Sequence, residues 1–207
     1  MPDILVEGAM KPLEEIYGPK FFARRDRLKW RCEIICNAVN AIFEPESVGD
    51  VGCGIGDYVY YWKNNLNVPS WGIEGSEAAR PYFVTDSVYV RDLRTEIVRL
   101  QADLVTCFEV FEHIEIEYSD ILIRNLTRMS NRLLISAAPP GAGGHHHVNC
   151  QPQEYWIGKM KIHNYEYDYM LTDLIKEELK PWRHRKELYH NNLMYFKRRH
   201  RNELPRV

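Results

Sequence analysis

Glycines at alternate positions, Gly52, Gly54 and Gly56, directly follow a short apolar run, and this feature constrains the fold more than any other in the chain. Residues 47–51 are expected to form a strand, and residues 57–65, which carry several aromatic side chains, a helix. Glycine lacks a Cβ, so it permits a tight turn and a close approach of the backbone to a ligand. The first N–H groups of a helix have no partner within the helix. The segment therefore predicts a strand–turn–helix unit that binds a ligand largely through its main chain.

Strands and helices alternate along most of the remaining sequence. Apolar runs predict strands at residues 47–51, 71–74, 88–91, 102–108, 132–138 and 192–197. Helical spacing of apolar residues predicts helices at residues 21–43, 57–65, 116–129, 152–161 and 168–179. This alternation predicts a doubly wound α/β fold, with a mostly parallel sheet and helices on both faces. With 207 residues, of which 45% are hydrophobic, the chain is expected to form a single domain, residues 1–207.

The bulk composition argues against several classes of protein. The formal net charge of −2 argues against electrostatic capture of nucleic acid by the whole chain. No stretch approaches the roughly 20 apolar residues of a membrane span, and the N-terminus has no apolar run of signal-peptide length. The five cysteines show no zinc-like spacing and are expected to be buried thiols in a reducing compartment. These features predict a soluble, cytoplasmic protein.

An acidic residue stands where a nucleotide-binding fold needs one. Glu74 ends the second expected strand about 18 residues after Gly56, close to the offset of about 20 residues at which a carboxylate binds ribose. A carboxylate at that place can accept hydrogen bonds from both ribose hydroxyls. A dinucleotide-binding enzyme needs glycines and such an acid as well, so these two features alone leave an NAD site open.

Segments in the right order resemble the motifs of the class I S-adenosylmethionine-dependent methyltransferases. They are residues 50–56, an acid and a hydrophobe followed by GxGxG, then residues 71–76, residues 91–93, and residues 108–113 with the sequence FEVFEH. The resemblance implies a Rossmann-like, seven-stranded sheet and S-adenosylmethionine as the cofactor. The G-x-G-x-G spacing and the segment around residues 108–113 favour this donor over NAD.

The resemblance also implies which residues bind the donor. They are Tyr17, Asp50, Gly52, Cys53, Gly54, Gly56, Glu74, Gly75, Ser76, Asp92, Leu93, Phe108 and Glu109. Within the domain, residues 1–44 are expected to be an arm and helix that can close over the site, with Tyr17 near the donor. Residues 45–140 are expected to form the donor-binding half, and residues 141–207 the acceptor side.

A loop rich in proline, glycine and histidine follows the fifth expected strand, at residues 139–152. Ligands of open α/β sheets bind outside the carboxyl ends of the strands, so this loop is expected on the same rim as Gly52 and Glu74. A hydroxyl nucleophile gains from a general base, and histidine has an unperturbed pKa of about 6.5 that suits this task. One of His145, His146 and His147 is therefore expected to be catalytic, although histidines that only hydrogen-bond the loop remain an alternative.

The loop resembles that of small bacterial and viral methyltransferases, in which an APPG…GHxxN-like segment precedes QPxEYW. This resemblance implies that His147 is the base or the substrate anchor. It implies substrate-binding roles for Asn149, Gln151 and Trp156, with Trp156 as an apolar or stacking wall. His113, in the segment at residues 108–113, is also expected to bind the substrate.

The sequence favours the absence of a metal. Adjacent residues of an extended loop point in alternate directions, so the three consecutive histidines do not reach one ion together. A pair such as His145 and His147 with an acid remains an alternative.

The function expected from these features is transfer of a methyl group to a hydroxyl of a small or carbohydrate acceptor, such as a surface glycan. No Asn/Asp-Pro-Pro-Tyr/Phe segment follows the fourth expected strand, which argues against methylation of exocyclic base nitrogens. A methyltransferase for protein or RNA, guided by the basic residues 197–201, is one alternative, and a non-catalytic donor-binding module is another. If the chain is viral, its place is the cytoplasm of the host cell. The oligomeric state is left open.

Overall fold

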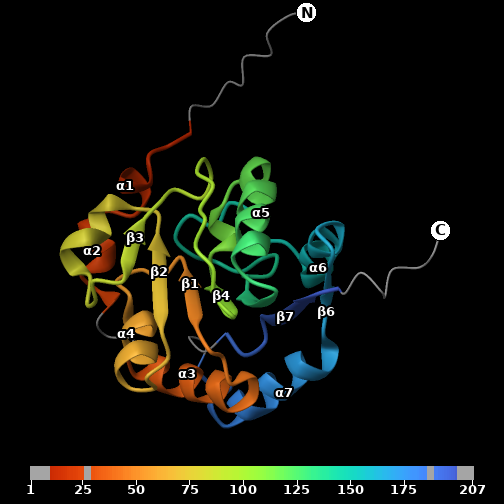
Figure 1. The fold of residues 1–207 in the computed structure, drawn as a ribbon. Helices are drawn as coiled ribbons and strands as arrows, with labels where there is room; N and C mark the ends of the chain where they lie inside the picture. Colours follow the sequence, from red (N-terminus) through yellow and green to blue (C-terminus); the bar gives the residue numbers. More distant parts are fainter. Residues whose placement is uncertain (1–9, 26–28, 186–188, 200–207) are drawn as a thin grey trace, which may run out of the picture.

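A computed structural model describes residues 10–25, 29–185 and 189–199, and its centre is a seven-stranded sheet with the order β3-β2-β1-β4-β5-β7-β6 (Figure 1). The strands are β1 (Val48–Val51), β2 (Ser70–Glu74), β3 (Val88–Val90), β4 (Leu104–Phe108), β5 (Arg132–Ser136), β6 (Tyr165–Tyr167) and β7 (Leu193–Arg198). The pairs among β1 to β5 are parallel, whereas β7 is antiparallel to both β5 and β6. The predicted mostly parallel, doubly wound sheet is confirmed.

Helices cover both faces of this sheet (Figure 1). The α-helices are α1 (Leu13–Ile16), α2 (Pro19–Phe22), α3 (Lys29–Phe43), α4 (Asp57–Asn64), α5 (Ser119–Met129), α6 (Gln153–Ile162) and α7 (Tyr169–Leu179). One core joins α5 and α6 to the sheet, and a second core joins α3, α4 and α7 to the other face. Successive residues of β5 alternate between the two cores, with Leu133 and Ile135 in the first and Leu134 in the second.

The structure departs from the expected elements in three places. The expected helix at residues 21–43 is interrupted, because α2 ends at Phe22 and α3 begins at Lys29. The helix expected from residue 116 begins as a short 3-10 turn, η4 (Ile116–Tyr118), before α5. Strand β6 was not predicted, since three residues at the sheet edge carry too little pattern to identify a strand. Residues 1–9 of the expected arm and residues 200–201 of the basic tail lie outside the described residues.

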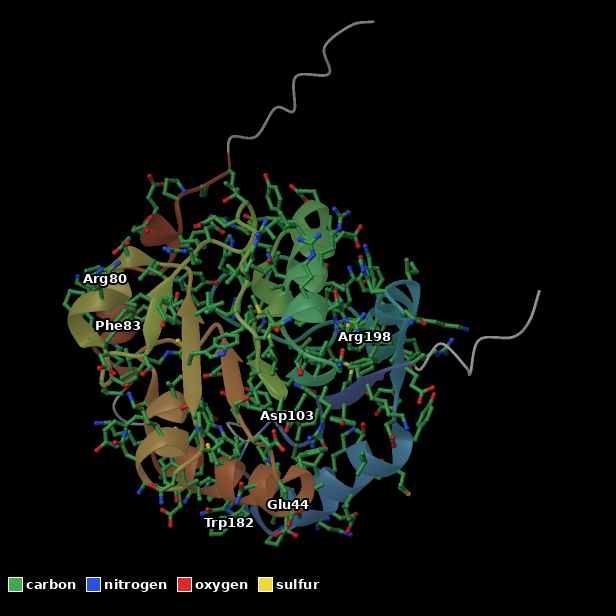
Figure 2. The ribbon with its side chains drawn as sticks, viewed as in Figure 1. Glu44, Arg80, Phe83, Asp103, Trp182 and Arg198 are labelled. Atoms are coloured by element: carbon green, nitrogen blue, oxygen red, sulfur yellow. The ribbon has the colours of Figure 1, made fainter. Side chains whose placement is uncertain are left out.

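The segment before α3 packs beside the end of the sheet formed by β3. Helix α2 contacts the 3-10 helix η2 (Glu77–Tyr82), and Arg80 and Phe83 mark this region in Figure 2. The side chain of Phe22 is buried there, against Ile55. The Ser76 hydroxyl donates a hydrogen bond of 2.9 Å to the Tyr17 carbonyl, which fixes the turn between α1 and α2.

The five cysteines are free, and all but Cys150 are buried. No helix among the described residues is long and apolar enough to cross a membrane.

Candidate functional site

The glycine turn after β1 has the conformation that its sequence requires. Gly52, Gly54 and Gly56 have φ angles of 73°, 60° and 86°, a region that other residues rarely adopt. A Cβ on Gly52 would lie 2.3 Å from Cγ2 of Val110, so the turn closes tightly onto the segment after β4. A Cβ on Gly54 would meet nothing within 4 Å, which leaves open space directly beside the backbone. The turn therefore exposes main chain to a cavity.

Glu74 lies at the end of β2, directly beside this turn. Its carboxylate accepts hydrogen bonds of 3.0 Å from the Gly54 and Ser76 N–H groups. Burial raises the pKa of the Glu74 carboxyl above its ordinary value, although these backbone N–H groups oppose the shift. The contact with Gly54 couples the acid to the glycine turn, so a ligand held by one is within reach of the other.

An apolar cavity opens at the carboxyl ends of the first strands. It is lined by Leu13, Tyr17, Phe21, Arg25, Val51, Gly52, Ile73, Glu74, Gly75, Arg91, Asp92, Leu93, Glu109, Val110, His113, Ile114 and Leu122. The expected donor residues Tyr17, Gly75 and Leu93 thus meet in one place. The carboxylate of Asp92 already binds Arg94, with Nη2 and Oδ2 2.8 Å apart. This cavity can take a flat, largely apolar group whose hydroxylated end faces Glu74.

A second, charged cavity adjoins the first, and the two share Gly52, Glu74, Glu109 and His113. It is lined by Phe21, Arg25, Arg31, Asp50, Gly52, Cys53, Gly54, Ile55, Asp57, Tyr58, Glu74, Phe108, Glu109, Glu112, His113, His147 and Tyr189. Carboxyl groups outnumber guanidinium groups in this lining, so it favours a ligand that carries positive charge.

Asp50 is a buried acid at this second cavity. Its Oδ1 accepts a hydrogen bond of 2.8 Å from the Thr106 hydroxyl, while Oδ2 is buried without a hydrogen-bond partner among the described residues. Burial raises the pKa of Asp50 to about 7, against the opposing effects of the Thr106 hydrogen bond and the Arg31 charge. A buried acceptor without a partner is costly, so a ligand donor at Oδ2 would be strongly favoured.

Arg31, which the sequence analysis missed, supplies a cation to the second cavity. Its guanidinium lies 5.6 Å from the ring centre of Tyr58 and 5.5 Å from that of Tyr189. These aromatic contacts hold the charge in place, and it faces the cavity, where a ligand carboxylate can meet it. The sequence carries a signal for this residue, because Arg31 is one helical turn before Ile35, on the buried face of α3.

Glu112, His113 and His147 form a cluster on the acceptor side of the second cavity. The rings of His113 and His147 lie 4.9 Å apart. Burial, followed by the charge of nearby Glu109, raises the pKa of Glu112 to about 8. Burial lowers the pKa of His113 to about 4, so its imidazole is neutral at pH 7. Glu112 was not among the expected site residues, although it belongs to a motif used for the resemblance.

The other loop histidines lie beside the N-terminal segment, outside the linings of the two cavities. His145 Nε2 is 2.7 Å from the Ile16 carbonyl, and its ring is 5.6 Å from that of Tyr17. His146 has a φ of 54° and places Nε2 3.9 Å from a Glu115 oxygen. Among the described residues of the loop, only His147 lines either cavity.

Several expected site residues do not reach the cavities. Trp156 is 1% exposed and packs against Phe111 in the core, with ring centres 4.8 Å apart. Asn149 is buried, donates hydrogen bonds to the Ile114 carbonyl and the Ser119 hydroxyl, and accepts one from Gln151. Ser76 caps η2. The structure thus places Trp156, Asn149, Gln151 and Ser76 in supporting positions around the site.

Comparison with known proteins gives structural likenesses only, since no family model and no curated protein sequence matches the chain. A sugar N-methyltransferase from Streptoalloteichus has a TM-score of 0.61 and 15% identity, with 97% of this chain and 98% of that one covered. The magnesium protoporphyrin IX methyltransferase from Synechocystis, solved with bound S-adenosylmethionine, has a TM-score of 0.58 and 17% identity over 91% and 90% of the two chains.

A plantazolicin methyltransferase, solved in complex with S-adenosylhomocysteine, has a TM-score of 0.58 and 14% identity, with 90% of each chain covered. These likenesses extend over nearly the whole length of all the chains compared. The chain therefore has the Rossmann-like fold of the S-adenosylmethionine-dependent methyltransferases.

Proposed function

We propose that the chain transfers a methyl group from S-adenosylmethionine to a hydroxyl of a small or carbohydrate acceptor. The observation that carries this proposal is the pair of adjoining cavities at the glycine turn, one apolar and one charged, with Glu74 between them. S-adenosylmethionine is divided in the same way, because its adenine base is largely apolar and its amino-acid end is charged, with the ribose between them. The proposal treats the chain as one domain, in which the segment around Tyr17 covers the donor.

In this arrangement the donor lies across both cavities. The adenine occupies the apolar cavity, and Glu74 accepts hydrogen bonds from the ribose hydroxyls. Asp50 Oδ2 accepts a hydrogen bond from the donor's ammonium group, and Arg31 binds its carboxylate. The sulfonium then lies between carboxyl groups of the second cavity, where its positive charge is stabilised. The ribose hydroxyls, the ammonium and the carboxylate of the donor thus each meet a residue of opposite charge or matching hydrogen-bonding capacity.

The acceptor hydroxyl approaches from the side of His147. A carbonyl oxygen can only accept, so the 3.2 Å contact of His147 Nδ1 with the Ala142 carbonyl places a proton on Nδ1. Nε2 then carries the lone pair, and it is the atom that activates the hydroxyl, as a proton acceptor in the simplest case. The polar groups around it, Glu109 and Glu112, suit a hydroxylated acceptor such as a sugar.

Replacement of Glu74 by alanine is expected to weaken binding of S-adenosylhomocysteine by at least about 1 kcal/mol, which is roughly fivefold in Kd. The variant loses the acceptor for the ribose hydroxyls and the contact that orders Gly54. Calorimetric titration measures this change, and Glu77→Ala, a change at an exposed acid of η2 outside both cavities, is the matched control. An unchanged Kd in Glu74→Ala would remove this residue from the donor site.

Donor affinity is expected to fall as the pH drops below about 7. Asp50, with its pKa raised to about 7, holds a proton in the empty protein below that pH, and the donor's ammonium must displace it. The Kd is expected to rise by up to about tenfold per pH unit below the pKa. Arg31, Glu74 and Asp57 face this carboxyl as well, so Asp50→Asn is the variant that isolates its contribution. If the Kd of Asp50→Asn depended on pH as strongly as the Kd of the unaltered chain, another group would be responsible for the pH dependence.

The function itself is tested by incubating the protein with methyl-labelled S-adenosylmethionine and a panel of acceptors. Label on monosaccharides, oligosaccharides or small alcohols supports the proposal. Label only on RNA or on protein would replace it with the corresponding macromolecular methyltransferase. Donor binding without label on any acceptor class would indicate a non-catalytic binding module.

A further inference from the structure

Side chains with metal-ligand chemistry converge from two separate segments on the second cavity. Ligand atoms of Glu112, His113 and His147 all lie within 4.8 Å of one another. Glu112 and His113 belong to the 3-10 helix η3 (Phe111–His113) after β4, whereas His147 belongs to the loop after β5. The N–H groups of Val148 and Asn149 donate hydrogen bonds of 2.9 and 3.0 Å to the Glu112 carbonyl. The backbone therefore holds the two segments together at the place where the side chains meet.

The Glu112 side chain has an unsatisfied requirement for a cationic partner. The residue is 0% exposed, and its buried carboxyl faces the Glu109 carboxyl and the Ala138 backbone. Oε1 of the neighbouring Glu109 is buried as well. Two acids side by side are unfavourable in a buried place unless a cation or a donor joins them.

In both histidines one ring nitrogen contacts a backbone carbonyl. His113 Nδ1 lies 3.2 Å from the His146 carbonyl, and His147 Nδ1 lies 3.2 Å from the Ala142 carbonyl. Since a carbonyl only accepts, each Nδ1 carries the proton and each Nε2 carries a lone pair. A hydrogen bond from the distal ring nitrogen to a backbone carbonyl is the usual way in which a protein orients an imidazole toward a metal.

We propose that Glu112, His113 and His147 bind a first-row divalent metal ion, with Glu109 beside it, at the acceptor end of the second cavity. Two imidazoles and one carboxylate suit an ion such as Mn²⁺, and they leave coordination positions open for a substrate. The sequence favoured the absence of a metal because three consecutive loop histidines do not reach one ion together, and it left a pair of them with an acid as the alternative. In the structure, Glu112 and His113, from another segment of the chain, lie beside His147 in place of the other two loop histidines.

The chemical role of this ion rests on the proposed function. The ion binds the acceptor's hydroxyl oxygen and lowers its pKa, in place of direct deprotonation by His147. An oxygen lone pair forms the new bond to the methyl carbon, while the carbon–sulfur bond breaks and leaves its electron pair on sulfur. The sulfonium becomes a neutral thioether, and the hydroxyl proton passes to the Glu109 carboxylate. A sugar with neighbouring hydroxyls can occupy two open positions of the ion and is the acceptor class that this site favours.

The test is direct binding of Mn²⁺ to the full chain after treatment with a chelator. Electron paramagnetic resonance measures the concentration of free Mn²⁺ during the titration, and one bound ion per chain is expected. Glu112→Gln and His147→Ala are expected to raise the Kd for Mn²⁺ by at least about tenfold. Glu112→Gln keeps the shape of the side chain and removes the carboxyl ligand, so it tests metal binding without changing the packing. Circular dichroism of each variant verifies the fold.

Matched controls come from residues outside the cavities. His163→Ala removes a histidine at the end of α6, and Glu154→Gln neutralises an acid in the first turn of the same helix. Both are expected to bind Mn²⁺ as the unaltered chain does. Absence of Mn²⁺ binding in the unaltered chain would overturn the proposal. So would a Kd for Mn²⁺ in Glu112→Gln and His147→Ala that equals the Kd of the unaltered chain.

The same preparations separate this inference from the proposed function. Methyl transfer to a hydroxyl that proceeds undiminished in excess chelator leaves the function in place and removes the metal. Mn²⁺ bound through Glu112 and His147 in a chain that methylates no acceptor supports the metal site and removes the function. Transfer that stops with chelator and returns with Mn²⁺ supports both.

Discussion

Replacement of His147 by alanine is expected to lower kcat for methyl transfer by about 10²–10⁴-fold, the range over which a positioned proton acceptor contributes to catalysis. The imidazole lines the charged cavity, and its Nδ1 contact with Ala142 leaves Nε2 to act on the acceptor. The loss applies whether Nε2 takes the hydroxyl proton itself or holds the ion that lowers the hydroxyl's pKa. Donor affinity is expected to remain within about twofold, because the donor contacts other residues.

Steady-state kinetics with labelled donor measures the change in kcat, and calorimetry with S-adenosylhomocysteine measures donor affinity. His163→Ala serves as the histidine control and is expected to retain full activity, since this residue lies at the end of α6. His147→Gln, which keeps a polar side chain of similar length, shows whether the loop depends on bulk alone. Retained turnover in His147→Ala, with unchanged KM for the acceptor, would remove His147 from the mechanism.

Replacement of Trp156 by alanine is expected to lower the free energy of unfolding by about 3–5 kcal/mol. The indole is 1% exposed and packs edge-on against Phe111, beneath the segment that carries Glu112 and His113. Its loss leaves a cavity that the surrounding sheet and α6 cannot fill by relaxation. Urea unfolding followed by circular dichroism measures the effect.

The matched control is Trp182→Ala, because Trp182 is 42% exposed and lies near α3 and α7 at the periphery of the molecule (Figure 2). Its replacement is expected to change the free energy of unfolding by no more than about 1 kcal/mol. If both variants lost the same small amount of stability, the indole of Trp156 would not be buried in the core. That outcome would favour its expected role as a wall of the substrate site.

Much of the fold was predictable because local patterns and tertiary contacts agree. The buried strand β4 and the glycine turn after β1 each occupy a place where hydrophobic period, turn chemistry and burial point to the same answer. Strand β6 was not predicted, since three edge residues become a strand only by pairing with β7. The interruption between α2 and α3 was not predicted, although residues 24–27 are all charged and the apolar stripe of the expected helix begins only at Leu28.

The donor side of the site was more predictable than the acceptor side. Gly52, Glu74 and Leu93 lie at or shortly after strand ends, so the topology alone brings them to one rim of the sheet. Arg31 reaches the second cavity from α3, and Glu112 reaches it through the pairing of η3 with the histidine loop. The helical position of Arg31 and the motif at residues 108–113 are local signals, but only the tertiary structure brings both residues to one cavity.

Polar and aromatic side chains in a loop motif carry no information about burial. Asn149 and Trp156 were expected to contact the substrate, whereas the structure uses them to hold that loop and the core beneath it. The hydrogen bonds of Asn149 to Ile114 and Ser119 explain why an amide is useful at this position without any contact with a ligand.

The proposed function depends on binding of S-adenosylmethionine in the paired cavities at the glycine turn. Isothermal titration calorimetry of the full chain with S-adenosylhomocysteine, and separately with NAD, measures this binding. The proposed site predicts one molecule of S-adenosylhomocysteine bound per chain with a micromolar Kd, weakened in Glu74→Ala, and no heat from NAD. No binding of S-adenosylhomocysteine, or tighter binding of NAD at the same site, would contradict the proposed function.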